Sequence, residues 1–411
     1  MTDKWYIDKL PTDVLLIIFD YCSIIDLSIL DCVCQRFHSI ICDDAVWIKR
    51  SHWSLIINQF SERFQARCNP LLSLREKWRI SNNWIKGKFT KEIIGTERVN
   101  SIPWLCLTKD ILWWSTGSSL NGYHRPSQKN TRNYMKKNCI YSWNNIVGDI
   151  CKFVVRDDCI ISGHRDGKIW LWSTKPDDDF NYGIEQAHSC SINAIDEVTD
   201  AIISGGSDGT IKIWQKNLDV QGVKPMMTHS ISDRIWSLGA DPDQQKFAVG
   251  SSGTQGSSPL RIFDIEYCRE TNFLNYNWKY GAGTLDLVWE NSNCLLSCGY
   301  DTDIKKWDLR IGKCVGAWTD PTDATVYCLS TDHNFTMLTG TQYNGKSVLW
   351  DQRQNKYIQL FFIKDLRGKQ SPVYSVSFDS SHIYGATDRQ LVEFSFLGNH
   401  NKTKDYRHMI G

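Results

Sequence analysis

The sequence predicts a small all-α unit with a helical linker, followed by an all-β propeller of seven blades. The first observation is a closing aromatic residue that recurs after 49, 42, 49, 44, 43 and 44 residues. A spacing of forty-odd residues is typical of four-stranded propeller blades. The second is a change of period near residue 85, from helical spacing to short apolar stretches between turns. The closing aromatics are Tyr123, Trp172, Trp214, Phe263, Trp307, Trp350 and Phe394.

The N-terminal unit, residues 5–50, is more apolar than a segment of its length can bury on itself. It opens with the run LPTDVLLIIF at residues 10–19. Further apolar positions follow at helical spacing, namely Leu27, Leu30, Val33, Cys34, Phe37 and Trp47. An exposed apolar surface of this kind indicates a docking site. We therefore expect a partner to cover these helices.

Residues 51–84 are expected to form a helical linker. Ile56, Phe60 and Phe64 recur at helical spacing, and Asn69-Pro70 interrupts the pattern before a second stretch up to Trp78. Spacer packing explains these residues without any further role.

The propeller is assigned to residues 85–398, with a C-terminal tail at 399–411. Its clearest unit is IISGGSDGTIKIW at residues 202–214, in which Ser204, Asp208 and Trp214 are separated by four and six residues. The units that end at Trp172 and Trp307 keep the same offsets. The last unit ends before a fourth strand, so residues 86–93 are expected to supply the strand that closes the ring.

Composition excludes several classes of function. The net charge of +1 gives no general attraction to nucleic acid or to an acidic membrane. The 15 cysteines contain no C-x2-C pair, so reduced thiols in an intracellular protein, cytoplasmic or nuclear, are expected and neither a metal nor a cofactor is. The apolar run at residues 14–19 is too short for a membrane span.

Residues 8–50 resemble the F-box, and the repeats with their Trp-Asp endings resemble WD repeats, so the chain is similar to F-box/WD-repeat proteins. The approach to the first blade is most similar to the dactylin group. The resemblance implies a Skp-family adaptor on the helices, a cullin and a RING subunit beyond it, and a protein substrate on the propeller. The residues that match the adaptor-binding positions are Leu10, Pro11, Ile18, Leu27, Leu30, Val33, Cys34 and Trp47.

The resemblance also implies that the substrate binds at the channel mouth of the propeller. By repeat position, the residues expected there are Arg165, Arg234, Trp236, Tyr300, Tyr327, Tyr343 and Tyr374. Aromatic residues and Arg are the types enriched at interface hot spots. A phosphorylated degron stays open, although no full arginine cluster supports it.

Two groups of residues suggest other chemistry. His188, Ser204 and Asp208 have the residue types of a hydrolase triad, but together with Trp214 they match the structural hydrogen-bond chain of a WD repeat. No G-x-S-x-G motif accompanies them. The basic run at residues 125–137 suggests RNA binding, and a surface loop explains it equally well.

The sequence thus predicts a non-catalytic substrate receptor of a Skp-cullin-F-box ubiquitin ligase. One alternative is a WD-repeat scaffold that uses the same helices for another partner, outside degradation. An RNA-binding propeller and a hydrolase are weaker alternatives, because the net charge and the repeat positions argue against them.

Overall fold

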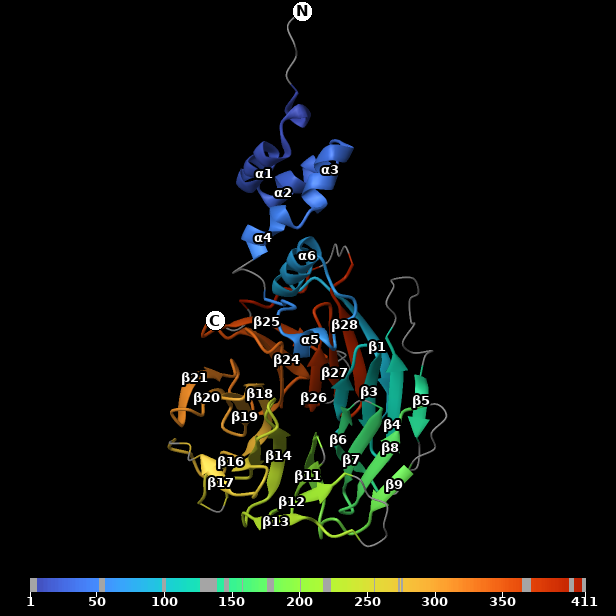
Figure 1. Ribbon diagram of the computed structural model, residues 1–411, viewed down its shortest axis with the longest axis vertical. Coiled ribbons are helices and arrows are strands. Elements are labelled where there is room, and N and C mark those ends of the chain that lie inside the picture. Colours follow the sequence, from blue (N-terminus) through green and yellow to red (C-terminus); the bar gives the residue numbers. More distant parts are fainter. Residues whose placement is uncertain are drawn as a thin grey trace, which may run out of the picture.

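A computed structural model of the protein describes residues 6–51, 56–97, 101–125, 139–143, 148–156, 158–175, 181–199, 201–216, 223–254, 256–272, 274, 276–363, 371–398 and 403–408. Figure 1 shows two parts: the helices α1–α3 lie at one end of the molecule, and the propeller forms the other, with α6 between them. Within the described ranges, no helix combines the length and the apolar character needed to cross a bilayer. The 15 cysteines, all of them described, are free thiols.

The helical part consists of short helices with local caps. Ser23 and Asp26 form a capping box at the start of α2, in which each side chain accepts a hydrogen bond from the backbone N–H of the other residue. The helices are η1 (Ile7–Lys9), α1 (Thr12–Tyr21), α2 (Ile24–Leu30), α3 (Gln35–Cys42), α4 (Ala45–Ser51), α5 (Glu62–Gln65) and α6 (Leu74–Ile85). Their own core contains Leu15, Phe19, Leu27, Phe37, Ile40, Ile41, Val46 and Trp47.

The propeller has seven four-stranded antiparallel sheets, as the repeat predicts. Blade one contains β2 (Leu105–Leu107), β3 (Ile111–Thr116), β4 (Ser119–His124) and β5 (Cys139–Trp143). Blade two contains β6 (Ile150–Arg156), β7 (Cys159–His164), β8 (Ile169–Ser173) and β9 (Asn181–Ile184). Blade three contains β10 (Ile192–Val198), β11 (Ala201–Gly206), β12 (Thr210–Gln215) and β13 (Met227–Ser230). Blade four contains β14 (Ile235–Ala240), β15 (Lys246–Ser251), β16 (Leu260–Asp264) and β17 (Glu270–Asn272). Blade five contains β18 (Thr284–Asn291), β19 (Cys294–Gly299), β20 (Asp303–Asp308) and β21 (Lys313–Thr319). Blade six contains β22 (Val326–Thr331), β23 (Thr336–Thr341), β24 (Lys346–Asp351) and β25 (Tyr357–Phe362).

The seventh blade closes the ring with a strand from the start of the propeller. β26 (Ser375–Phe378), β27 (His382–Ala386) and β28 (Gln390–Ser395) are joined by β1 (Thr90–Thr96), which pairs antiparallel with β28 from Thr90–Ser395 to Thr96–Gln390. This strand overlaps the segment 86–93 that the sequence suggested. Because the closure pairs both ends of the ring, it leaves no gap between the first and last blades.

Candidate functional site

The N-terminal helices present apolar side chains to solvent. Ten of the 22 exposed large apolar side chains in the described chain fall within residues 6–48. On α1 they follow helical spacing at Val14, Ile17, Ile18 and Tyr21, and on α2 at Ile25 and Ile29. Such a concentration on so short a segment marks an interaction surface. We call these six residues the helical docking face.

The predicted adaptor-binding residues divide by burial. Pro11, Ile18 and Val33 are exposed, whereas Leu10, Leu30 and Cys34 are partly buried. Leu27 and Trp47 do not share the exposed surface expected of the whole set, because they are only 1% and 4% exposed and lie in the core of the helical unit. The indole Nε1 of Trp47 donates a hydrogen bond to the Ile41 carbonyl at 2.7 Å, so this side chain faces inward. Both residues therefore support the docking face from within.

The sequence interpretation missed part of the docking face. Tyr21 is 89% exposed and Ile25 is 74% exposed, and Ile17 and Ile29 are exposed beside them. The available signal was their position: on a short helix they lie away from the residues that fill its core, such as Leu15 and Leu27.

A polar joint connects the helical unit to α6. Arg75 donates hydrogen bonds to the Asp31 carboxylate at 2.7 Å and to the Cys42 sulfur at 3.2 Å. The bond from Arg75 lowers the pKa of Asp31. Asp31, His38 and Cys42 each offer a potential metal ligand within 4.8 Å of the others, but the guanidinium of Arg75 already bonds to two of them. The arrangement therefore fits a joint better than a metal site.

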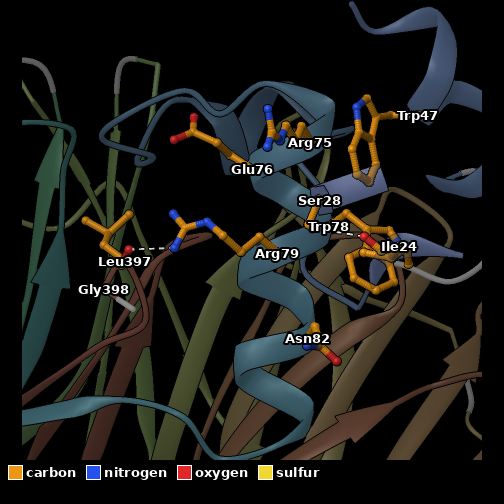
Figure 2. Close-up of a pocket in the computed structure, with 10 residues that line it drawn as sticks. All are labelled: Ile24, Ser28, Trp47, Arg75, Glu76, Trp78, Arg79, Asn82, Leu397 and Gly398. Carbon is orange, nitrogen blue, oxygen red and sulfur yellow. Dashed lines mark hydrogen bonds between the residues drawn. The ribbon is translucent and has the colours of Figure 1, made fainter. Parts of the chain in front are cut away.

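Next to this joint lies a groove of about 860 Å³ between α2, α6 and the end of the propeller (Figure 2). Trp47 and Trp78 line it, with ring centroids 6.5 Å apart. Figure 2 shows Arg79 reaching from α6 to the Leu397 carbonyl, to which it donates a hydrogen bond of 2.8 Å. The groove thus lies at the junction between the helical unit, α6 and the propeller.

The linker is fixed firmly to the propeller. Trp84 of α6 stacks on Phe396 with ring centroids 4.1 Å apart and donates a hydrogen bond to the Ser380 carbonyl at 3.1 Å. Arg63 and Arg67 donate to the carbonyls of Trp289 and Thr331, which lie near or at the ends of β18 and β22. The linker therefore covers the channel at the end where the innermost strands finish.

Arg125 strengthens the same region. This residue begins the basic run that suggested RNA binding, but it is buried, ion-paired with Asp379 and hydrogen-bonded to the Arg67 carbonyl at 2.8 Å. Burial alone would raise the pKa of the Asp379 carboxyl, whereas Arg125 and His382 hold it well below its usual range. Arg125 is thus a structural residue. The rest of the run up to Lys137 lies outside the described residues.

The opposite end of the channel holds a pocket of about 270 Å³. Because the innermost strands all run from this mouth toward the linker, residues near their starts meet here. The pocket brings together five of the predicted substrate-binding residues, namely Arg165, Trp236, Tyr300, Tyr327 and Tyr374. Trp104 lines it too and was missed, because blade one departs from the repeat pattern. We call the whole lining of this pocket the channel mouth.

The two remaining predicted residues lie close by. Arg234 lines a neighbouring hollow of about 530 Å³ that shares Trp236 and Tyr300 with the channel mouth. Tyr343 is 45% exposed and lies outside both linings. Burial raises the pKa of Tyr327, with smaller contributions from Tyr300, Tyr374 and Tyr343, so these phenols lie near one another.

The triad-like residues of blade three form a buried chain. The Trp214 indole donates to the Ser204 hydroxyl at 2.9 Å, the Ser204 oxygen lies 2.8 Å from Nε2 of His188, and Nδ1 of His188 lies 3.1 Å from the Asp208 carboxylate. His188 and Ser204 are buried, and burial lowers the pKa of His188. Because the serine hydroxyl is enclosed between an indole and an imidazole, it is not available to attack a substrate.

Comparisons with known proteins agree with this two-part architecture. A family model described as F-box-like matches residues 7–52, and one described as WD domain, G-beta repeat matches residues 182–215. The chain is 31% identical over 393 residues to F-box/WD repeat-containing protein 4 of Homo sapiens, covering 94% of this chain and 92% of that protein. The mouse protein of the same name is 31% identical over 395 residues, covering 94% of this chain and 93% of that protein. Autophagy-related protein 16 of Arabidopsis thaliana is 24% identical over 54% of this chain and 40% of its own length.

Proposed function

Because the chain belongs to the F-box/WD-repeat protein family, we propose that it is the substrate-recognition subunit of a Skp-cullin-F-box ubiquitin ligase. In this function the F-box binds a Skp-family adaptor, the adaptor joins it to the cullin and the RING subunit, and the propeller binds the protein to be ubiquitinated. The chain itself is non-catalytic and acts in the cytoplasm or the nucleus.

The observation that carries this proposal is the helical docking face. Its six apolar side chains are exposed to solvent by 39% to 89%, and complete burial of a fully exposed one under an adaptor is worth roughly 1.5–3 kcal/mol. After the entropic costs of association, a handful of such side chains is sufficient for a stable complex.

The linker supports the second half of the proposal. It is anchored to the propeller through Trp84, Arg63 and Arg67, so a protein held by the propeller keeps a defined distance from the adaptor. A receptor of this kind accelerates ubiquitin transfer by proximity and orientation alone.

A binding experiment with the full chain tests the adaptor half. Ile25→Asp combined with Ile29→Asp is expected to abolish retention of a recombinant Skp-family adaptor and of its cullin, because two charges would be buried without partners. Ile311→Asp is the matched control, since Ile311 is 58% exposed on the propeller, and it is expected to retain both proteins. Equal retention by all three proteins contradicts the proposal.

The alternative is a WD-repeat scaffold whose F-box serves another partner. The docking face alone is compatible with either function. If the wild-type chain binds no Skp-family adaptor while Ile25→Asp with Ile29→Asp still removes a different partner, the scaffold function is favoured.

A further inference from the structure

Five of the thirteen residues that line the channel mouth are aromatic. Tyr327 and Tyr374 meet edge to face, with ring centroids 5.4 Å apart and planes at 66°. Trp236, Tyr300 and Trp104 are the other aromatic residues of the lining, and Ile102 and Leu285 add aliphatic surface. Around them Ser191, Asn193 and Ser207 contribute uncharged polar groups. Rigid aromatic walls with a few neutral hydrogen-bonding groups are suited to an inserted apolar side chain.

The charges around the channel mouth are already compensated. Arg165 is the one charged side chain among the described residues that line it, and it is paired with Asp149 at 3.4 Å. Lys152, on β6, is paired with Asp286 at 3.8 Å and lies over the Trp104 ring at 3.2 Å from its centroid. A phosphoryl group in this pocket would therefore lose water and gain one guanidinium that Asp149 already contacts, not a cluster of cations.

The neighbouring hollow does not offer a phosphate site either. Arg234 lines it together with the carboxylates of Asp208 and Asp233. Burial alone would raise the pKa of Asp233, but hydrogen bonds from the Ser252 hydroxyl, from the Gly253 N–H at 2.8 Å and from Thr254 at 3.2 Å lower it. Both carboxylates are therefore ionised and oppose a second anion beside Arg234.

The size of the channel mouth points to a protein segment. Its volume of about 270 Å³ lies below the roughly 300–1,000 Å³ of typical small-molecule sites. Its surroundings are open on one side, since Tyr300 is 43% exposed and Tyr343 is 45% exposed. One large side chain can enter while the adjoining residues of its segment lie across the rim.

We propose that the channel mouth recognises an unphosphorylated segment of the substrate, which inserts one aromatic or large aliphatic side chain between Trp236, Tyr300 and Tyr327. This inference rests on the proposed function and assigns the class of substrate to its propeller. The inserted side chain supplies the binding energy. Asn193 donates hydrogen bonds to Ser207 and to the Ile235 carbonyl, both at 2.8 Å, so these polar groups hold the wall of the pocket in place.

Selection from a phage-displayed library of random 12-residue peptides on the full chain tests this inference. The enriched peptides are expected to share an aromatic or large aliphatic residue. Synthetic versions are expected to bind at least tenfold more weakly to Tyr327→Ala and to Tyr300→Ala, as measured by fluorescence polarisation. Tyr267→Ala, which truncates a tyrosine that is 59% exposed outside the pocket lining, is the matched control and is expected to bind normally. Tyr300→Ala removes an exposed ring, so it keeps the test valid if Tyr327→Ala unfolds.

Three results would overturn the inference. The first is failure of the wild-type chain to enrich any sequence relative to Tyr300→Ala. The second is binding that both tyrosine variants leave unchanged. The third is tenfold tighter binding after phosphorylation of the same peptides, with the gain lost in Arg165→Ala or Arg234→Ala. Because the adaptor experiment concerns the opposite end of the molecule, failure of the wild-type chain to retain the adaptor, with intact peptide binding, contradicts the proposed function alone.

Discussion

The helical unit and the propeller treat apolar side chains of the same kind in opposite ways. On α2, Ile25 and Ile29 stand in water, whereas Ile202 and Ile203 of β11 are fully buried. The helical unit has a single small core, while every propeller blade packs against two neighbours and the ring has no open end. The propeller thus buries its apolar side chains within its own ring, whereas the helical unit leaves part of its own uncovered, as the proposed docking requires.

The largest expected effect concerns the buried ion pair of Arg125 and Asp379, where the linker meets the propeller. Arg125→Ala removes the guanidinium that pairs with the buried Asp379 carboxylate, leaves His382 as its remaining cationic neighbour, and also removes the hydrogen bond to the Arg67 carbonyl. We expect a loss of about 3–5 kcal/mol in the free energy of unfolding, measured by urea denaturation. Arg310→Ala, which removes an exposed ion pair with Asp308, is the control and is expected to leave the transition unchanged. A small effect of Arg125→Ala would mean that the linker joint contributes little.

Two neighbouring residues of α2 separate stability from binding. Leu27→Ala creates a cavity in the helical core and is expected to reduce the stability of the helical unit by about 2–5 kcal/mol. Ile25→Ala removes an exposed side chain, so the thermal midpoint is expected to stay the same while adaptor affinity falls. Adaptor titration and thermal unfolding of both variants measure the contrast. If Ile25→Ala unfolds the protein instead, the docking face is part of the core.

The same two residues show where sequence reasoning ends. The helix IIDLSIL carries apolar residues on more than one side. Its sequence therefore predicts an apolar helix but does not tell which of these residues face the core and which face solvent. By contrast, the repeat of Ser, Asp and Trp predicts the blades, because each blade repeats one local unit.

Long-range pairs were equally out of reach. Arg125 belongs to a basic run near the start of the propeller sequence, and Asp379 lies near its end. Only closure of the ring brings the two side chains together. The residues of the channel mouth could be predicted by repeat position, because equivalent positions on successive innermost strands converge at one end of the ring. The sequence did not predict Trp104 as a residue of the channel mouth, because β2 has only three residues and its unit lacks the repeat signature.

Within the propeller, blades three and five form a finer comparison. Ser204 bonds to both Trp214 and His188, whereas Ser297 bonds to Trp307 and a lysine pairs with the turn Asp301. Ser204→Ala is expected to reduce stability by about 1–3 kcal/mol, because it leaves two buried ring nitrogens unpaired, and Ser297→Ala by less. Urea denaturation of both variants ranks them. Ser204→Ala is also expected to leave any hydrolase activity of the preparation unchanged. Loss of such an activity would favour a catalytic role for His188, Ser204 and Asp208.

The smallest expected effect is a pH dependence where the linker meets the propeller. Burial lowers the pKa of His333 from 6.5 to about 3, and Arg63 and Arg67 of the linker add to the shift. The unfolded chain therefore binds a proton near pH 6.5 that the folded chain does not, so stability falls as the pH decreases from 6.5 toward 3. His333→Asn suits the positive φ of 57° and removes this titration. Between pH 7.5 and 5.5 the wild type is expected to lose about 1 kcal/mol more than the variant, as measured by urea denaturation at each pH. Because Asp332 titrates in both proteins, the difference between them isolates His333, and parallel pH profiles would show that folding does not lower the pKa of His333.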